Sequence, residues 1–378
     1  MVYELRQVLA LHKIPMMRQR GIIAGMPVAL LTCGLFLSGL GIVPISGDAS
    51  ARSLQEELRH ILATHPRLQG ERKVVGAADD SIRQSRSGYL PGVVLSGDVG
   101  QEYVDSPSRR STEREDFFDT RRSTTLTITQ NLFNGFATDS DVEISKLNKQ
   151  RALLNLRVVE QSVLFDGIRS YINVLKQSRL LDIAKRNERT LQDQLDLESA
   201  RVERGSGLAV DVLQAKSRLQ LARERVVSLL GDLREAHSVY LELFNRPATP
   251  AQMSRPQIPR DSLPETVDAA LAVANSENVV LKISNRDVDI ASEERTVAQS
   301  TYWPRIDLVG EGAWEKNVDG VPGVRREGQV TVRAIWSLFD GFLTSASSAK
   351  ASKNYGTSLD RRRFVDRDVQ NRVRQAWS

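Results

Sequence analysis

The stretch from Ala137 to about Arg201 contains no proline and a single glycine, Gly167. At a rise of 1.5 Å per residue, a helix of this length would extend ~100 Å. Few folds can accommodate so long a helix, and this stretch therefore constrains the architecture more than any other feature. Apolar residues recur along it at intervals of three, four and seven, as in an amphipathic helix: Leu154, Val158, Phe165, Ile168, Ile172 and Leu175.

The sequence Gly205-Ser206-Gly207 interrupts this helix, and both glycines are expected to need positive φ in a tight turn. A second helix is predicted from Ala209 to about Phe244, because two apolar series repeat there every seven residues. Such a seam predicts a left-handed supercoil, so residues 137–244 should form an antiparallel coiled-coil hairpin. The two series are Val212, Leu219, Val226, Leu233 and Tyr240, and Ala215, Ala222, Leu229, Ala236 and Leu243.

The segment before the long helix predicts two short helices and a β-hairpin. The helices are expected at 53–64 and 66–87, and Tyr89-Leu90-Pro91 stops the second one. Apolar and polar residues then alternate in two strands within residues 91–132, joined by a polar loop at 105–122. Strands of about ten residues with one apolar side are typical of a transmembrane barrel, although a soluble sheet has a similar pattern.

The same order of elements recurs, which predicts an internal duplication with copies at residues 52–262 and 263–378. The second copy has a helical stretch at 262–301, the stop Tyr302-Trp303-Pro304, and strands at 306–314 and 330–336 around a loop at 315–328. A helix from Thr344 is still running at Ser378, so this copy is interpreted as truncated, and residues 245–262 as an equatorial linker between the copies. Four strands are too few to close a barrel, and the pattern therefore predicts an oligomer.

The first 51 residues are predicted to be a secretory signal peptide. Basic residues precede an apolar run from Ile22 to Val43, and Ala49-Ser50-Ala51 is an A-x-A cleavage pattern. A retained membrane anchor is the alternative, which the glycines and proline of the run disfavour. Cys33 is the only cysteine and lies inside the run, in surroundings that loosely resemble a lipidation site, so the mature chain is expected to contain no disulfide.

The composition disfavours several classes of function. The net charge is +5 and the isoelectric point about 9.3, but the basic clusters are short and accompany no nucleic-acid-binding motif, so no nucleic-acid partner is predicted. No glycine-rich phosphate loop, nucleophile elbow or H-E-x-x-H motif occurs. The chain is therefore predicted to be neither an enzyme nor a cofactor- or metal-binding protein. The histidines, which lack metal-ligand spacing, are His12, His60, His65 and His237.

In this order, the motifs resemble the TolC-like outer-membrane efflux family over residues 53 to 378. The resemblance rests on the repeated order of elements, the aromatic-proline stops, the exits Phe133-Asn134-Gly135-Phe136 and Phe339-Asp340-Gly341-Phe342, and the turn at Gly205. It implies a mainly α-helical protein with membrane β-strands, in which three identical chains share one barrel in the outer-membrane lipid and continue as a helical tunnel through the periplasm. The implied partners are a periplasmic adaptor and an inner-membrane ABC or RND transporter.

The Asn/Asp-Gly-Phe exits favour the branch of the family that serves type I protein secretion. Drug or metal efflux by the same fold is the first alternative. A soluble periplasmic coiled-coil adaptor or scaffold is the second, but such a protein needs no duplicated strands with aromatic ends.

Two sets of residues are candidates for function. By resemblance, the first set forms the periplasmic tip, where it constricts the tunnel or contacts the adaptor; capping of the turn, and for Asp211 a favourable interaction with the helix dipole, are the simpler roles. It comprises Gly205, Gly207, Leu208, Ala209, Val210 and Asp211. The second set clusters at strand ends, as in the aromatic belt of a membrane barrel or, more weakly, the rim of a soluble sheet. It comprises Tyr89, Phe133, Phe136, Tyr302, Trp303, Trp336, Phe339 and Phe342.

Overall fold

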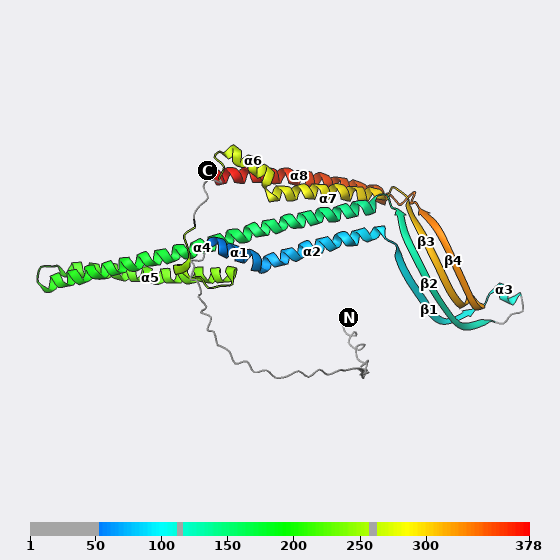
Figure 1. Cartoon of the computed structure of the whole chain (residues 1–378), viewed down its shortest axis with the longest axis horizontal. Coiled ribbons are helices and arrows are strands. Elements are labelled where there is room, and N and C mark those ends of the chain that lie inside the picture. The colour runs from blue at the N-terminus through cyan, green and yellow to red at the C-terminus, as the bar shows by residue number, and fades with distance from the viewer. Residues whose placement is uncertain (1–52, 112–115, 257–262) are drawn as a thin grey trace, which may run out of the picture. The chain divides into compact units, whose positions relative to one another are not determined.

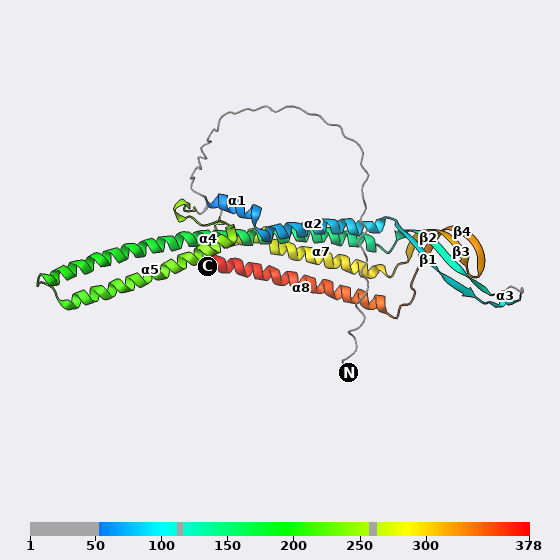
Figure 2. The same cartoon turned by 90° about the horizontal axis from the view of Figure 1, so that it is seen from below.

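A computed structural model describes residues 53–111, 116–256 and 263–378 of the chain (Figures 1 and 2). The predicted signal peptide, with Cys33, lies outside the described residues, as does the last part of the linker. The described residues all belong to one structural unit. Its helices are α1 (Leu54–Thr64), α2 (Pro66–Arg86), α3 (Pro107–Arg110), α4 (Ala137–Glu203), α5 (Ala209–Phe244), α6 (Val267–Glu277), α7 (Val279–Ser300) and α8 (Leu343–Trp377), with short 3-10 turns η1 (Ser87–Tyr89) and η2 (Pro250–Gln252).

Side-chain caps determine where the shorter helices begin. Ser53 and Glu56 form a capping box that starts α1, and Pro66 occupies the first position of α2. The predicted single helical stretch at 262–301 is wrong, because it consists of α6 and α7 with a break at Asn278. That residue has an extended backbone, and its side-chain oxygen accepts hydrogen bonds from the backbone nitrogens of Val280 and Leu281.

The coiled-coil hairpin consists of α4 and α5, whose limits lie close to the predicted ones. Residues of the heptad seam are buried along α5, including Leu219, Val226 and Leu229, and the last two pack with Leu181 of α4. Alternating large and small residues in this seam allow the two helices to approach closely.

The end of α5 meets the start of α2 in the main hydrophobic core. Tyr240 and Phe244 stack with ring centroids 4.3 Å apart, and they share a cluster with Leu68 of α2 and Tyr171 of α4. The Tyr171 hydroxyl donates a hydrogen bond to the carbonyl oxygen of Ser254 in the linker, at 2.8 Å. This core therefore joins the start of α2 and the end of α5 to the middle of α4.

The helices nearest the sheet lie side by side in the order α2, α4, α7, α8 (Figure 2). Each helix contacts its neighbours in this row, and α2 and α8 are the two outermost members. The chain passes from one end of this row into the sheet, while the α4–α5 hairpin extends beyond the other end and turns at the tip farthest from the sheet (Figure 1).

The four strands form one antiparallel sheet in the order β1-β2-β3-β4. The two hairpins have corresponding registers, because Gly92 pairs with Thr129 in the first and Arg305 with Ile335 in the second. The edges of the sheet are β1 and β4. The strands are β1 (Gly92–Val104), β2 (Phe117–Phe133), β3 (Arg305–Val318) and β4 (Val321–Ile335).

Both predicted loops within the hairpins were too long. β2 begins at Phe117, inside the predicted loop at 105–122, and Phe117 pairs with Val104. The predicted loop at 315–328 is mostly strand, and only Asp319 and Gly320, both at positive φ, form the turn. Charged residues can occupy these strands because a ladder of backbone hydrogen bonds does not depend on side-chain polarity. The acidic residues among them lie on the polar face of the sheet.

Candidate functional site

The sheet has one apolar and one polar face. Directly paired residues of neighbouring strands lie on the same face, and successive residues lie on opposite faces. The register therefore defines an apolar face that contains Val93, Leu95, Val99, Leu126, Ile128, Leu308, Val330 and Val332. The polar face contains Ser96, Thr125, Thr127, Thr129, Gln329, Thr331 and every acidic residue of the four strands.

An arginine on the polar face of each hairpin lies between two carboxylates. Arg121 contacts Asp98 at 3.2 Å and Glu102 at 3.8 Å. Arg325 contacts Glu315 at 3.4 Å and Glu327 at 2.9 Å. The first three of these pairs connect adjacent strands, whereas Arg325 and Glu327 both belong to β4. Their side chains are partly open to solvent, so each pair contributes modestly to stability.

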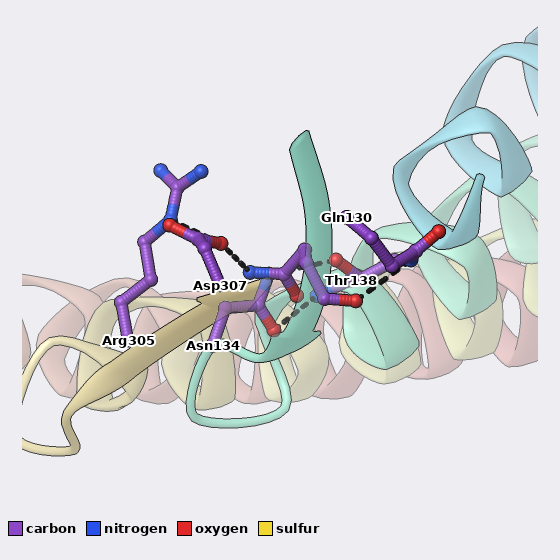
Figure 3. Close-up of polar contacts among 6 residues, drawn as sticks. Gln130, Asn134, Thr138, Arg305 and Asp307 are labelled. Carbon is purple, nitrogen blue, oxygen red and sulfur yellow. Dashed lines mark hydrogen bonds and ion pairs between the residues drawn. The ribbon is translucent and has the colours of Figure 1, made fainter. Parts of the chain in front are cut away.

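A buried carboxylate connects the two hairpins near the helices (Figure 3). Asp307 of β3 is only 5% exposed and accepts hydrogen bonds from Arg305 Nε at 2.8 Å and Asn131 Nδ2 of β2 at 2.9 Å. A buried charge needs such partners, because desolvation disfavours an unpaired carboxylate. The contact fixes the register of β2 against β3 at the point where the strands approach the helices.

The strands end in two matching corners that lead into α4 and α8. Gly135 and Gly341 both have φ of 67°, and Phe136 and Phe342 both have φ of 69°. In each corner the residue before the glycine bonds a threonine four residues later: Asn134 accepts from the nitrogen of Thr138 at 3.3 Å, and Asp340 accepts from the nitrogen and hydroxyl of Thr344.

The hydrogen bonds from Thr344 hold the pKa of the Asp340 carboxyl below its usual value. The bond from the hydroxyl has the larger effect, and the bond from the backbone nitrogen has the next largest.

The surroundings of the two corners differ. A Cβ atom built on Gly135 would lie 2.4 Å from the carbonyl oxygen of Ser300, at the end of α7. A Cβ atom built on Gly341 would meet no heavy atom within 4 Å. The first corner is therefore packed against a neighbouring helix of the same chain, whereas the second is open.

The predicted aromatic residues gather around these corners. Phe133 makes edge-to-face contacts with Phe136, at a centroid distance of 5.4 Å, and with Trp303 at 6.5 Å. Phe339 and Phe342 repeat the first contact at 5.5 Å. Of the eight predicted aromatics, Phe133 is half-buried and the other seven are exposed in this single chain: Tyr89, Phe136, Tyr302, Trp303, Trp336, Phe339 and Phe342.

Polar bonds fix two of these rings. The Tyr89 hydroxyl donates to Asp139 at 2.6 Å, and this bond raises the pKa of the tyrosine above its ordinary value. The indole nitrogen of Trp336 donates to the carbonyl oxygen of Tyr302 at 3.2 Å.

The sequence analysis missed a second group of aromatics at the far end of the strands. Tyr103 and Phe118 form a direct pair on the apolar face, and Trp314 lies on the same face of β3. Phe118 fell within the predicted loop and was therefore not assigned to a strand. The alternation of Tyr103 with Val99, on the same face of β1, was the signal that could have identified this end of the hairpin.

The predicted tip residues surround the α4–α5 turn. Gly205 has φ of 77°, as expected, but the expectation of positive φ for Gly207 is wrong. Gly207 is instead needed for space, because a Cβ atom there would lie 3.0 Å from the backbone nitrogen of Val202. Leu208, Ala209 and Val210 are exposed at the start of α5, and the backbone nitrogen of Asp211 bonds the carbonyl oxygen of Leu208 at 3.0 Å.

Neither a metal centre nor a membrane-crossing helix is found in the described part of the chain. Among residues 53–111, 116–256 and 263–378, no cluster of His, Cys, Asp and Glu has the composition of a metal site. No described helix combines the length and the hydropathy of a membrane span.

Comparisons with known proteins agree on one family. Residues 58–238 match the outer membrane efflux protein family. The chain is 22% identical over 354 residues to the outer membrane efflux protein BepC of Brucella suis, covering 92% of this chain and 74% of BepC. It is 24% identical over 358 residues to the alkaline protease secretion protein AprF of Pseudomonas aeruginosa, covering 91% and 73%. The crystal structure of the outer membrane protein VceC from Vibrio cholerae has a TM-score of 0.67 at 12% identity, covering 83% of this chain and 75% of VceC.

A long coiled-coil hairpin that leads into a four-stranded antiparallel sheet is the fold that the chain shares with these solved structures. The family match over residues 58–238, the relatives and the solved structures all make the chain similar to the TolC-like outer membrane efflux proteins. It is therefore a protein of the Gram-negative outer membrane that extends into the periplasm.

Proposed function

We propose that this chain is one protomer of a trimeric export duct, in which three sheets close into a single transmembrane barrel. The observation that carries the proposal is the sheet itself, which has two unpaired edges, one apolar face and one polar face. Unpaired strand edges and an exposed apolar face are both costly in isolation, and closure in a membrane satisfies both. Three copies of a four-stranded sheet give about 12 strands, and the polar face then lines the lumen.

An internal duplication explains how the edges would meet. The two hairpins share their register, and the two corners share their backbone angles and hydrogen bonds. Within the chain, β2, the second strand of the first copy, pairs with β3, the first strand of the second copy. In a ring, β4 would therefore pair with β1 of the next copy in the corresponding register.

This rule gives specific contacts between copies. Thr125 of β2 pairs with Ala313 of β3 within the chain. The equivalent of Thr125 in β4 is Thr331, and the equivalent of Ala313 in β1 is Gly100, so Thr331 should pair with Gly100 of the next copy. In the same way, Thr127 pairs with Glu311 within the chain, and their equivalents Arg333 and Asp98 should pair between copies. Both derived pairs place residues of the polar face opposite each other, and the second brings together opposite charges. The agreement of faces and charges supports the proposed closure.

The open second corner fits the same scheme. The residue that corresponds to Ser300 is Ser87, at the end of α2. In a ring, Gly341 would therefore lie against Ser87 of the next copy, as Gly135 lies against Ser300 within the chain. The outermost helices α8 and α2 would become neighbours, which would also close the row of helices into a tunnel wall.

The dimensions of the apolar face suit a membrane. Ile306 to Trp314 extends about 27 Å along β3 at ~3.4 Å per residue, and a strand tilt of ~40° reduces this to about 21 Å of height, close to the ~25 Å apolar band of outer-membrane barrels. We propose that the eight predicted aromatics form the belt at the helical end of this band. Tyr103, Phe118 and Trp314 would form the belt at the other end.

We propose that the tip residues face the periplasmic partner. Leu208, Ala209 and Val210 present an exposed apolar surface on a tight turn at the end of the hairpin that lies farthest from the sheet. Such a surface suits docking of an adaptor protein, which would connect the duct to an inner-membrane transporter. In this scheme Asp211 lies at the entrance of the tunnel.

Type I protein secretion, with an ABC transporter at the inner membrane, is the process that we favour. AprF, one of the relatives, is a secretion protein for alkaline protease. The Asn134-Gly135-Phe136 exit and its repeat at Asp340 also favour this branch. BepC is described as an efflux protein, so drug or metal efflux with an RND transporter is the second candidate.

Two measurements test this function. Outer membranes of a Gram-negative host that expresses the chain are extracted with detergent, and the protein is analysed by size exclusion with light scattering. A trimer in the outer-membrane fraction is expected, whereas a soluble periplasmic monomer would refute the duct and support the scaffold alternative. Deletion of the gene in its own host should abolish export of a secreted protein; a change in drug or metal tolerance with export intact would instead support efflux.

A further inference from the structure

Three cationic side chains share the apolar face at the end of the sheet that is remote from the helices. Arg122 of β2 is directly paired with Lys316 of β3, and Arg326 of β4 is paired with Trp314 on the same face. Arg326 is therefore a diagonal neighbour of Lys316. We name Arg122, Lys316 and Arg326 the outer cation cluster. It lies toward the end of the strands at which Figure 1 shows α3.

The cluster has no anionic partner in the described structure. All acidic residues of the four strands lie on the polar face, and none of the three cations forms an ion pair with another described residue. Like charges that are directly opposite on neighbouring strands destabilise a sheet. Arg122 beside Lys316 is therefore unfavourable unless an external anion lies between them.

The adjacent arginines make a contrast within the same strands. Arg121 and Arg325 each precede a member of the cluster by one residue, lie on the polar face and contact carboxylates. The chain thus separates its strand-end arginines into two sets, one neutralised within the protein and one left without a partner on the face that would meet lipid.

An apolar hollow lies next to the cluster on the same face. Its volume is about 310 Å³. It is lined by Leu126, Ile128, Gly310, Gly312, Gly328 and Val330, together with Glu311 of β3 and Gln329 of β4. Gly312 and Gly328 are paired, so no side chain fills the floor of the hollow. Gly312 is two residues before Trp314, which places the hollow just beyond the cluster in the direction of the helices.

We propose that this surface binds a membrane lipid whose phosphate-bearing headgroup has a net negative charge, with the phosphate at the outer cation cluster and an acyl chain in the hollow. The inference rests on the proposed function, because the barrel turns this face toward lipid and sets the cluster at the outer leaflet. Cations near an anionic membrane surface contribute about a factor of five each in affinity. A zwitterionic lipid lacks the net negative charge that three cations require.

The test is lipid binding by the detergent-extracted trimer, followed by native mass spectrometry. The probe is a diphosphorylated lipid A, and phosphatidylethanolamine is the comparison. Binding of lipid A should fall on the order of a hundredfold in Arg122→Gln/Lys316→Gln/Arg326→Gln. It should persist in Arg122→Lys/Lys316→Arg/Arg326→Lys, which keeps the charges, and in the matched control Arg121→Gln/Arg325→Gln, which changes the neighbouring arginines of the other face.

Each other outcome contradicts the inference. Equal binding by the wild type and the charge-free variant would overturn it, as would equal losses in the charge-free variant and the matched control. Complete displacement of lipid A by inorganic phosphate would reduce the site to a simple anion site without use of the hollow. A wild-type protein that forms no outer-membrane trimer would refute the proposed function as well, whereas a trimer without lipid selectivity would refute only this inference.

Discussion

Substitution of each corner glycine by alanine should distinguish contacts made within one chain from contacts made only in the assembly. Gly135 and Gly341 have the same φ of 67°, so an alanine at either position incurs the same backbone cost of roughly 1–2 kcal/mol. At Gly135 the new Cβ atom would also lie 2.4 Å from the carbonyl oxygen of Ser300, and the forced shift adds about 1–3 kcal/mol. At Gly341 nothing within the chain opposes the Cβ atom.

The expected result depends on the state that is measured. In a dissociated single chain, Gly135→Ala should lower the free energy of unfolding by about 2–5 kcal/mol and Gly341→Ala by only about 1–2 kcal/mol. In the assembled protein the two variants should be similarly damaged, because Gly341 then contacts Ser87 of the next copy. Denaturant unfolding followed by circular dichroism measures the first quantity, and the heat-dependent loss of the oligomer on gels measures the second. An assembled Gly341→Ala protein that loses clearly less stability than assembled Gly135→Ala would refute the proposed contact.

Three further predictions concern the helices and their ends. Tyr240→Ala removes a ring that stacks on Phe244 in the main core and should lower the free energy of unfolding by roughly 3–5 kcal/mol, measured by denaturant titration. Because the pKa of Asp340 is lowered in the folded state, its stabilising contribution is present above the ordinary pKa of about 4 and is lost as the pH falls through the lowered value. The thermal midpoint of the wild type should therefore fall more steeply in acid than that of Asp340→Asn. In ultraviolet titration against Tyr89→Phe, the pKa of Tyr89 should exceed that of free tyrosine, and Asp139→Asn should bring it back toward ~10.

The helices were predictable because their signals are local. The absence of proline, the Gly205 turn and the heptads of α5 predicted the coiled coil with nearly the observed limits. The break at Asn278 was missed because the apolar pattern continues across it, and only the capping role of the asparagine side chain interrupts the helix. The corresponding break at Pro66 was easier to recognise, since proline is an explicit signal.

The strand limits were harder to predict, because charged residues were taken as signs of loops. The alternation that places Glu311, Glu315 and Glu327 on one face is visible in the sequence, but it becomes decisive only once the partner strands are known. Asp319-Gly320 between two alternating runs was the available signal for a tight hairpin. The contact between Gly135 and Ser300 could not be derived from the sequence, because it joins residues that are distant along the chain.

Disulfide crosslinking between copies tests the closed ring most directly. In a Cys33→Ser background, Gly100→Cys and Thr331→Cys should be direct partners across the β4–β1 boundary, where paired Cα atoms lie about 4.5–5.5 Å apart, within the range of a disulfide. A Cβ atom at Gly100 meets no heavy atom within 4 Å, so the cysteine fits. The matched control is Val99→Cys with Thr331→Cys, in which the two side chains lie on opposite faces. A closed trimer predicts an oxidation ladder of monomer, dimer and trimer that stops at three and is absent from the control and from each single variant; no crosslink in outer membranes, or a ladder that continues beyond three, would contradict it.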